Sequence, residues 1–88
     1  MAAGRPRRQS PKYNSLQAMG ENIHAIRKHM KMNQTNFGKM FGVTQMTVSK
    51  WERAMAGPNA KQIMLICYKC GVSADDLLGI PREWVKIK

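Results

Sequence analysis

Acidic residues are scarce in this chain of 88 residues, which has five Asp and Glu against fifteen Lys and Arg and a formal net charge of +10. With so few carboxylates, no nucleophile and base fall into a pattern that would assemble a catalytic site, so we expect no enzyme. The positive charge exceeds what solubility requires. It indicates a polyanionic partner, and nucleic acid is the first candidate, ahead of an anionic membrane surface.

Long hydrophobic runs and cysteines are also few. No apolar stretch approaches the roughly 18 residues of a membrane-spanning helix, and no signal-peptide pattern opens the chain, so we expect a cytoplasmic protein with no membrane partner. Cys67 and Cys70 form a lone CxxC. A zinc site needs four ligands, and a redox pair needs a thioredoxin-like βαβ unit. We interpret both residues as ordinary thiols and expect no metal and no other cofactor.

Residues 33–53 lack the period-two alternation of a strand and instead carry apolar residues at helical spacing, in two groups. The groups are Phe37, Met40 and Phe41, then Val48, Trp51 and, just beyond this range, Met55. Gly42 between them suits a left-handed turn, and Gly38, one turn earlier, leaves room for a second helix to approach. Asn33 and Thr44 are suited to cap the two helices. The segment is therefore predicted to be a helix-turn-helix.

Three more helices are expected outside this segment. An apolar stripe at spacings of three and four predicts a helix over residues 15–31, with His24 and His29 off the stripe and solvated. The stripe consists of Leu16, Met19, Ile23, Ile26 and Met30. A further helix is predicted to begin at a capping box of Asn59 and Gln62 and to end at Gly71. Its inward candidates are Ile63, Ile66, Cys67 and Cys70.

A short last helix is predicted between Ser73, as its N-cap, and Gly79. The sequence thus predicts an all-α fold of five helices in residues 15–79. A basic arm, residues 1–14, precedes it and is expected to be disordered because it lacks periodicity and is rich in Pro and Arg. Residues 80–88 follow as a C-terminal tail.

Residues 33–53 resemble the Cro/C1-type (XRE) helix-turn-helix proteins, the small phage and bacterial repressors. Their pattern places Gln at the start of the first helix, a small residue four positions later and Gly at the turn. A polar run then opens the second helix, which ends in Trp-Glu-Arg. The matching residues are Gln34, Gly38, Gly42, Thr44, Gln45, Met46, Thr47, Trp51, Glu52 and Arg53. Gly38 stands where Ala is usual, and Ala54 stands where Gly usually follows.

The resemblance spans about residues 19–78 and implies a five-helix lambda-repressor-like domain that binds double-stranded DNA. It implies a transcriptional repressor that occupies a pseudo-palindromic operator as a homodimer, in a bacterial cytoplasm and associated with the nucleoid. No small-molecule ligand is expected. Two alternatives stay open: an antitoxin-like regulator that also binds a protein partner, and a protein-interaction module on the same fold that has lost DNA binding.

The amino end of the second helix of the motif carries the candidates for base readout. At 100° per residue, its outer face turns away from Val48 and Trp51, and in helix-turn-helix docking this end meets base edges. Gln can grip adenine, Lys can donate to guanine, and Met or a Thr methyl can pack on a thymine methyl. The residues are Gln45, Met46, Thr47 and Lys50. Alternatively, they are ordinary solvent-facing side chains.

Contacts with the DNA backbone are expected from polar residues around the same motif. Gln34 opens the first helix, where the helix dipole attracts phosphate. The resemblance implies that Gln34 also braces Gln45. The full set is Asn33, Gln34, Asn36, Thr44, Ser49 and Arg53. Arg27 and Glu52 match family positions that commonly pair, which would join the first helix to the recognition helix.

Both ends of the chain carry further hypotheses. Residues 4–8, with Arg5, Arg7 and Arg8, resemble the AT-hook core and could lie in a narrow minor groove; alternatively they are a basic tail with unspecific attraction. The tail contains four apolar residues that could form a dimerisation patch. They are Ile80, Trp84, Val85 and Ile87. Alternatively, Trp84 folds back to close the core of the monomer.

Overall fold

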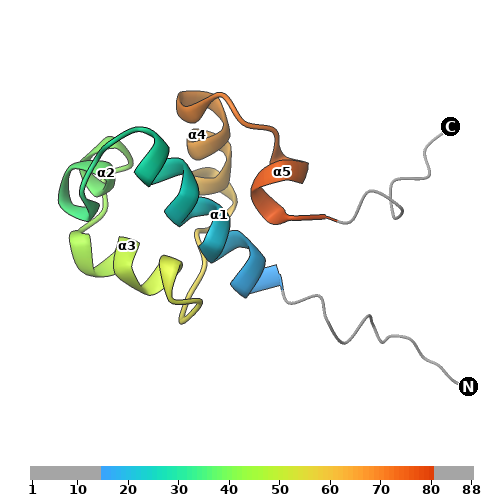
Figure 1. The fold of residues 1–88 in the computed structure, drawn as a ribbon, viewed down its shortest axis with the longest axis horizontal. Coiled ribbons are helices and arrows are strands. Elements are labelled where there is room, and N and C mark those ends of the chain that lie inside the picture. The colour runs from blue at the N-terminus through green and yellow to red at the C-terminus, as the bar shows by residue number, and fades with distance from the viewer. Residues whose placement is uncertain (1–14, 81–88) are drawn as a thin grey trace, which may run out of the picture.

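The structure, a computed structural model, describes residues 15–80, which contain five α-helices and no strand (Figure 1). The helices are α1 (Ser15–His29), α2 (Gln34–Met40), α3 (Gln45–Glu52), α4 (Ala60–Cys70) and α5 (Ala74–Leu78). The all-α, five-helix fold is thereby confirmed. The predictions for the basic arm, and those for Trp84, Val85 and Ile87, lie outside the described residues.

Four of the five helices begin directly after the residue that the sequence predicts as the cap. The side chains of Asn33, Thr44, Asn59 and Ser73 each accept a hydrogen bond from the backbone N–H three residues later. Asn59 does so in a complete capping box with Gln62. Since these bonds satisfy backbone donors that a helix start leaves free, they fix where each helix begins.

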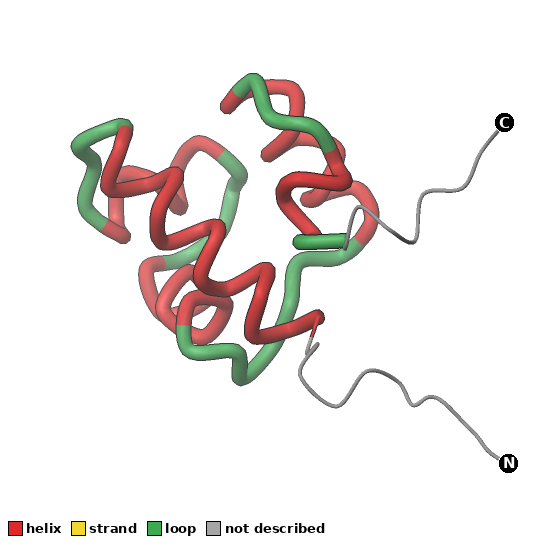
Figure 2. Tube along the Cα trace, turned by 45° about the vertical axis from the view of Figure 1, so that its right-hand side comes forward, coloured by secondary structure: helices red, strands yellow, loops and turns green. Residues whose placement is uncertain are grey.

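One fully buried side chain from each helix builds the core. Figure 2 shows the course of the helices and of the loops that join them. These residues are Ile23, Phe37, Val48, Ile66 and Leu77. Burying an aliphatic or aromatic side chain of this size contributes about 1.5–3 kcal/mol. Helix α1 packs against both α3 and α5, and α2 packs against α3. The helix-turn-helix formed by α2 and α3 is therefore held on the same core as the rest of the domain.

Two glycines shape the corner between α2 and α3. Gly42 has φ +70°, which L side chains rarely adopt, and a Cβ at Gly38 would lie 2.7 Å from the carbonyl oxygen of Val43. The turn thus needs a left-handed residue, and the close approach needs a residue without a side chain. Both roles agree with the expectations for these positions.

Three details differ from the sequence predictions. Met55 was expected to point inward but is 63% exposed, because α3 ends at Glu52 and the backbone turns left-handed at Ala54 (φ 61°). The helical period that assigned Met55 to the core no longer applies beyond that point. Leu16, in the first turn of α1, is 41% exposed rather than part of the buried stripe. Helix α1 ends at His29 rather than at the predicted residue 31, because the backbone turns left-handed at Lys31 (φ 59°).

Helix α4 buries less than its pattern indicates. Of its four inward candidates only Ile66 is fully buried; Ile63, Cys67 and Cys70 are half-buried against the core. Both cysteines are free thiols, and burial raises the pKa of each. They are therefore poor nucleophiles at neutral pH, as thiolates are the reactive form.

Candidate nucleic-acid interface

The amino end of α3 presents the side chains proposed for base readout. Val48 and Trp51 bury the inner face of the helix, at 0% and 2% exposure. On the outer face Gln45, Met46 and Lys50 are exposed, and Met46 reaches 56%. Thr47 is half-buried, and its hydroxyl shares a 3.1 Å hydrogen bond with that of Thr44. The orientation agrees with the sequence analysis, and contact with DNA stays a prediction.

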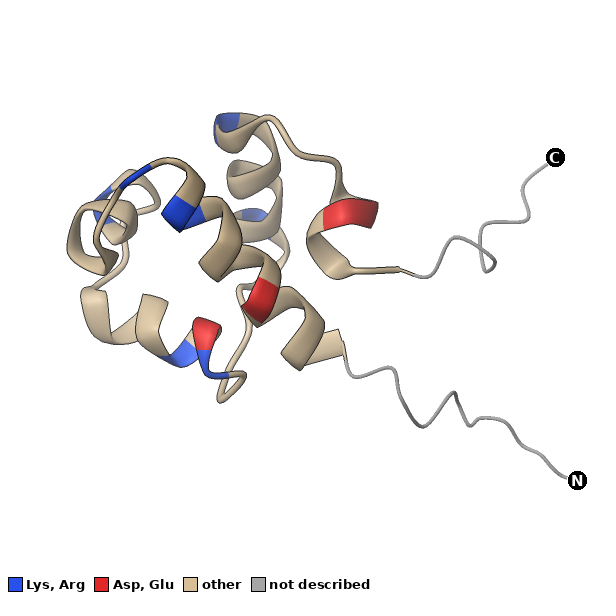
Figure 3. Cartoon of the chain, viewed as in Figure 1, with Lys and Arg blue, Asp and Glu red and all other residues tan. Residues whose placement is uncertain are grey.

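Helices α2 and α3 carry no acidic side chain before Glu52, the last residue of α3. Lys39 and Lys50 lie on these two helices and Arg53 follows them, whereas Glu52 is their one acid and is engaged internally. Asp75 and Asp76 belong to α5, at the far end of the described part of the molecule (Figure 3). An anionic partner would therefore meet less repulsion at the helix-turn-helix than at α5.

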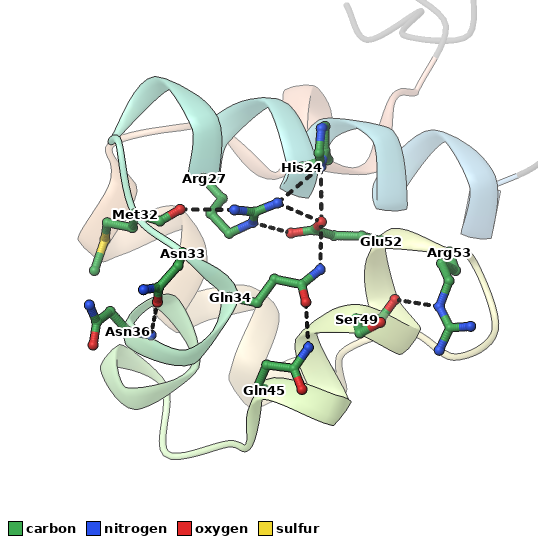
Figure 4. A network of polar contacts seen from close by, with 10 residues as sticks. All are labelled: His24, Arg27, Met32, Asn33, Gln34, Asn36, Gln45, Ser49, Glu52 and Arg53. Carbon is green, nitrogen blue, oxygen red and sulfur yellow. Dashed lines mark hydrogen bonds and ion pairs between the residues drawn. The ribbon is translucent and has the colours of Figure 1, made fainter.

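Arg27 and Glu52 join α1 to the end of α3. Arg27 Nε donates to Glu52 Oε2 at 2.6 Å, and Nη2 donates to Oε1 at 3.0 Å. The third nitrogen, Nη1, donates to the carbonyl oxygen of Met32 at 2.9 Å, just before α2 (Figure 4). One guanidinium thus ties α1, the start of α2 and the end of α3 together.

This ion pair is shielded from water, since the side chains of Arg27 and Glu52 are 10% and 6% exposed. Burial alone would raise the pKa of Glu52, but hydrogen bonds from Arg27, His24 and Gln34 outweigh it and hold that pKa below its ordinary value. The hydrogen bond to Glu52 likewise raises the pKa of Arg27. Both groups are therefore charged at neutral pH. Removing one partner would leave the other charge poorly solvated.

His24 also belongs to this cluster, which the sequence analysis missed. It was expected to be solvated, and its side chain is indeed 52% exposed, but its Nδ1 lies 2.9 Å from Glu52 Oε1. Because a carboxylate oxygen only accepts, Nδ1 must carry the hydrogen of that bond. His24 precedes Arg27 by one helical turn, and this spacing was the one signal in the sequence that the two share a face of α1. That Glu52 packs against this face is seen only in the folded chain.

Gln34 connects the ion pair to the recognition helix. Its Nε2 donates to Glu52 Oε1 at 3.1 Å, and its Oε1 accepts from Gln45 Nε2 at 2.5 Å (Figure 4). The resemblance implied the bracing of Gln45 by Gln34. The link from Gln34 to Glu52 was not anticipated. Together these bonds run from α1 to the exposed amino end of α3.

The remaining candidates for DNA-backbone contact lie near the same surface. Asn33 caps α2, and the Asn36 side chain is exposed. Ser49 is half-buried, and its carbonyl oxygen accepts from Arg53 Nε at 3.4 Å. Arg53 itself is exposed and directly follows α3 (Figure 4). Arg5, Arg7 and Arg8 lie outside the residues that the structure describes.

Residues 15–80 contain no group of three or more His, Cys, Asp or Glu side chains placed to hold a metal ion. No helix within that range is long and apolar enough to cross a membrane.

Comparison with known proteins finds a helix-turn-helix family model, a phage repressor and an antitoxin that are similar to this chain. A helix-turn-helix family model matches residues 23–77. The chain is 40% identical over 64 residues to repressor protein C2 of Salmonella phage P22, covering 73% of this chain and 30% of that protein. It is 30% identical over 61 residues to antitoxin PezA of Streptococcus pneumoniae, covering 69% of this chain and 39% of the antitoxin. The chain therefore spans well under half of the length of either relative.

A solved structure extends the similarity to three dimensions. The crystal structure of the P22 c2 repressor protein in complex with a synthetic operator matches with a TM-score of 0.66 at 40% identity. The match covers 70% of this chain and 94% of that chain. The fold and the sequence therefore agree on the same group of proteins.

Proposed function

Because the chain belongs to the helix-turn-helix family, whose model matches residues 23–77, we propose that it binds specific sites in double-stranded DNA and represses transcription by occupying an operator. It would act in a bacterial cytoplasm, at the nucleoid. The relative from phage P22 is a repressor, and its solved complex contains operator DNA. Repression would be steric, since bound protein excludes other proteins from the same DNA.

One observation carries this proposal: an exposed Gln45 is bonded through Gln34 to a buried ion pair. The side chain that would meet a base edge is tied through Gln34 to Glu52, whose own side chain is 6% exposed. A solvent-facing glutamine with no binding role gains little from such support, because immobilising it costs side-chain entropy. A base-reading glutamine gains, since preorganisation lowers the cost of binding.

The other contacts follow from the same docking geometry. With the amino end of α3 in the major groove, Met46, Thr47 and Lys50 would reach neighbouring bases. The DNA backbone would pass beside polar groups at both helix starts and along α3. These groups are Asn33, Gln34, Asn36, Thr44, Ser49 and Arg53. They would fix the register of the protein without reading sequence.

We also propose that the protein binds as a homodimer. One recognition helix covers few base pairs, so two copies spaced one helical turn apart, about 34–36 Å, would read a pseudo-palindrome. The contact would come from the tail, whose first apolar residue, Ile80, is half-buried at the end of α5. Trp84, Val85 and Ile87 would complete the patch.

The basic arm would add affinity through charge. Arg5, Arg7 and Arg8 stand together in the first eight residues. In a minor groove they would favour the narrow grooves of A·T-rich DNA, where the negative potential is enhanced. A plain basic tail would instead attract any duplex equally.

An antitoxin-like regulator is the second candidate, and the similarity to antitoxin PezA favours it. Such a protein would bind DNA with the same surface and hold a toxin with another part of the chain. The two functions agree on the helix-turn-helix and differ in whether a protein partner exists.

Selection of bound duplexes from a random pool tests the proposal. Recovery of a pseudo-palindromic sequence, bound more tightly than unrelated DNA at the same salt concentration, would support it. A triple variant of the arm (Arg5→Gln, Arg7→Gln, Arg8→Gln) should bind DNA with a weaker salt dependence. If all three arginines neutralise phosphates, the negative slope of log affinity against log salt should become shallower by about 2.7. Absence of salt-dependent binding to any duplex would instead favour the protein-interaction module.

A further inference from the structure

The chain of hydrogen bonds that joins Glu52 to Gln45 through Gln34 has a direction, and Glu52 sets it. A carboxylate has two acceptor oxygens and no donor. The side chain of Glu52 is 6% exposed and receives hydrogen bonds from Arg27 and His24, which keep it ionised. Only a donor can therefore face Oε1 from Gln34, and Nε2 of Gln34 does so at 3.1 Å.

The orientation of Gln34 then fixes that of Gln45. With Nε2 turned to Glu52, the carbonyl oxygen of Gln34 faces α3, where it accepts from Gln45 Nε2 at 2.5 Å. The opposite orientation of the Gln45 amide would bring two carbonyl oxygens together without a hydrogen between them. The carboxylate of Glu52, at the other end of α3, thus determines the orientation of the Gln45 amide.

This direction decides what Gln45 can offer to a base. One of its two amide hydrogens is used by Gln34, which leaves one donor and the carbonyl acceptor on the exposed side. In the major groove adenine presents one acceptor, N7, and one donor, the N6 amino group. Guanine presents two acceptors, N7 and O6. A single donor beside an acceptor matches adenine and leaves guanine with one unpaired oxygen.

We propose that Glu52 is a positioning residue for base discrimination: its acceptor-only carboxylate aligns Gln34, and through Gln34 it aligns Gln45 to prefer adenine over guanine. The proposal rests on the proposed function, because it requires that Gln45 meets a base. It assigns Glu52 a role beyond the ion pair with Arg27. The ion pair holds Glu52 in place, and Oε1, which also accepts from Arg27 and His24, directs the glutamines.

A glutamine in place of Glu52 would remove the direction while keeping the shape. Its amide offers a donor as well as an acceptor, so Gln34 could face it with either end. Gln45 could then reverse, or could release Gln34 and turn both amide hydrogens toward guanine. The preference for adenine should weaken even where overall affinity is retained.

The test begins by locating the base that Gln45 reads. The wild-type full chain and Gln45→Ala are compared on every single base-pair substitution of the selected duplex. A position whose identity matters to the wild type but not to Gln45→Ala is the one that Gln45 contacts. The readout at that position is the ratio of affinities for adenine and guanine. A ratio cancels losses that affect all sites equally, such as a weakened fold.

Three variants are then measured at that position. Glu52→Gln and Gln34→Met break the two links of the relay and should each lower the adenine-to-guanine ratio at least fivefold. Arg27→Lys is the matched control, since it loses the two-point ion pair but leaves an ionised Glu52 to direct Gln34. We expect it to lower overall affinity and to keep the ratio within twofold of the wild type.

Each variant is checked for folding by circular dichroism before binding is measured. If Glu52→Gln does not fold, the pair Arg27→Met with Glu52→Gln, which leaves no uncompensated charge, replaces it. An unchanged ratio in a folded Glu52 variant, or in Gln34→Met, overturns the proposal while leaving DNA binding intact. A position where Gln45 prefers guanine also overturns it. If the wild type selects no duplex at all, the proposed function fails and this inference fails with it.

Discussion

Gly20 of α1 lies directly against the carbonyl oxygen of Trp51 in α3, and a Cβ added at Gly20 would come within 2.5 Å of that oxygen. The same Cβ would lie 3.1 Å from the carbonyl oxygen of Glu52. Helix α1 therefore packs against the end of α3 too closely for a side chain at position 20. Neither oxygen can move without shifting α3, since both belong to its backbone.

Gly20→Ala should destabilise the domain, although it improves helix propensity. Alanine in a helix is favoured over glycine by about 1 kcal/mol, but overpacking costs about 1–3 kcal/mol. We expect the free energy of unfolding in urea to fall. Gly57→Ala is the matched control, because its Cβ would meet only the movable ends of Leu16 and Met19. A Gly20→Ala protein more stable than the wild type would show that α1 and α3 can separate freely.

Gln45→Ala should lose specific binding more than unspecific binding. Loss of a bidentate base contact costs about 1–3 kcal/mol on the preferred site and much less on unrelated DNA. Fluorescence anisotropy with both duplexes at one salt concentration measures the difference. Equal losses on the two duplexes would place Gln45 on the DNA backbone instead.

Arg27→Ala and Glu52→Ala should each lower stability and operator affinity, and the double variant should lose less than the sum. Each single change leaves one poorly solvated charge behind, at a cost of about 3–5 kcal/mol for a buried pair. Urea denaturation of the wild type and the three variants gives the coupling energy. Strictly additive losses would falsify the pairing.

Stability should depend on pH through Glu52. Its pKa is lower in the folded protein than its ordinary value of 4.5, so folding favours the ionised form. The resulting stabilisation is fully present above about pH 4.5 and is lost as pH falls through the lower folded-state pKa. The difference in unfolding free energy between the wild type and Glu52→Gln should therefore shrink on acidification below about pH 4.5. A difference that stays constant down to about pH 3 would contradict the assignment.

Charged substitutions in the tail should separate the proposed dimer. Trp84→Glu combined with Ile87→Glu would place two carboxylates in the proposed apolar contact, where burying them is costly. Sedimentation should show a folded monomer that binds a half-site weakly. An unchanged dimer would place the contact elsewhere on the surface. An unfolded protein would indicate that Trp84 closes the core of the monomer.

Local features of the fold were predictable because they depend on neighbours in sequence. The caps at Asn33, Thr44, Asn59 and Ser73, and the left-handed glycines at Gly42, Gly71 and Gly79, each need only a few adjacent residues. The same local reasoning failed at Met55, where it extended the period of α3 past its end. The left-handed Ala54 stops the helix there, and alanine carries no local signal for that conformation.

The network of the candidate site was harder to foresee, because its bonds join residues far apart in sequence. His24 and Glu52 are 28 residues apart, and Gln34 and Glu52 are 18 apart. The resemblance to a known family supplied the Arg27–Glu52 and Gln34–Gln45 links. It did not supply the two other bonds to Glu52, which depend on how α1 and α2 sit against the end of α3.

Because each of the five helices contributes one fully buried side chain to a single core, no helix can leave without exposing part of that core to water. Small domains built this way unfold as one unit, with no stable intermediate. Helix α3 is therefore expected to fold and unfold together with the rest of the domain. A substitution far from α3, at Leu77 in the five-residue α5 for example, would set the fraction of molecules able to bind at all.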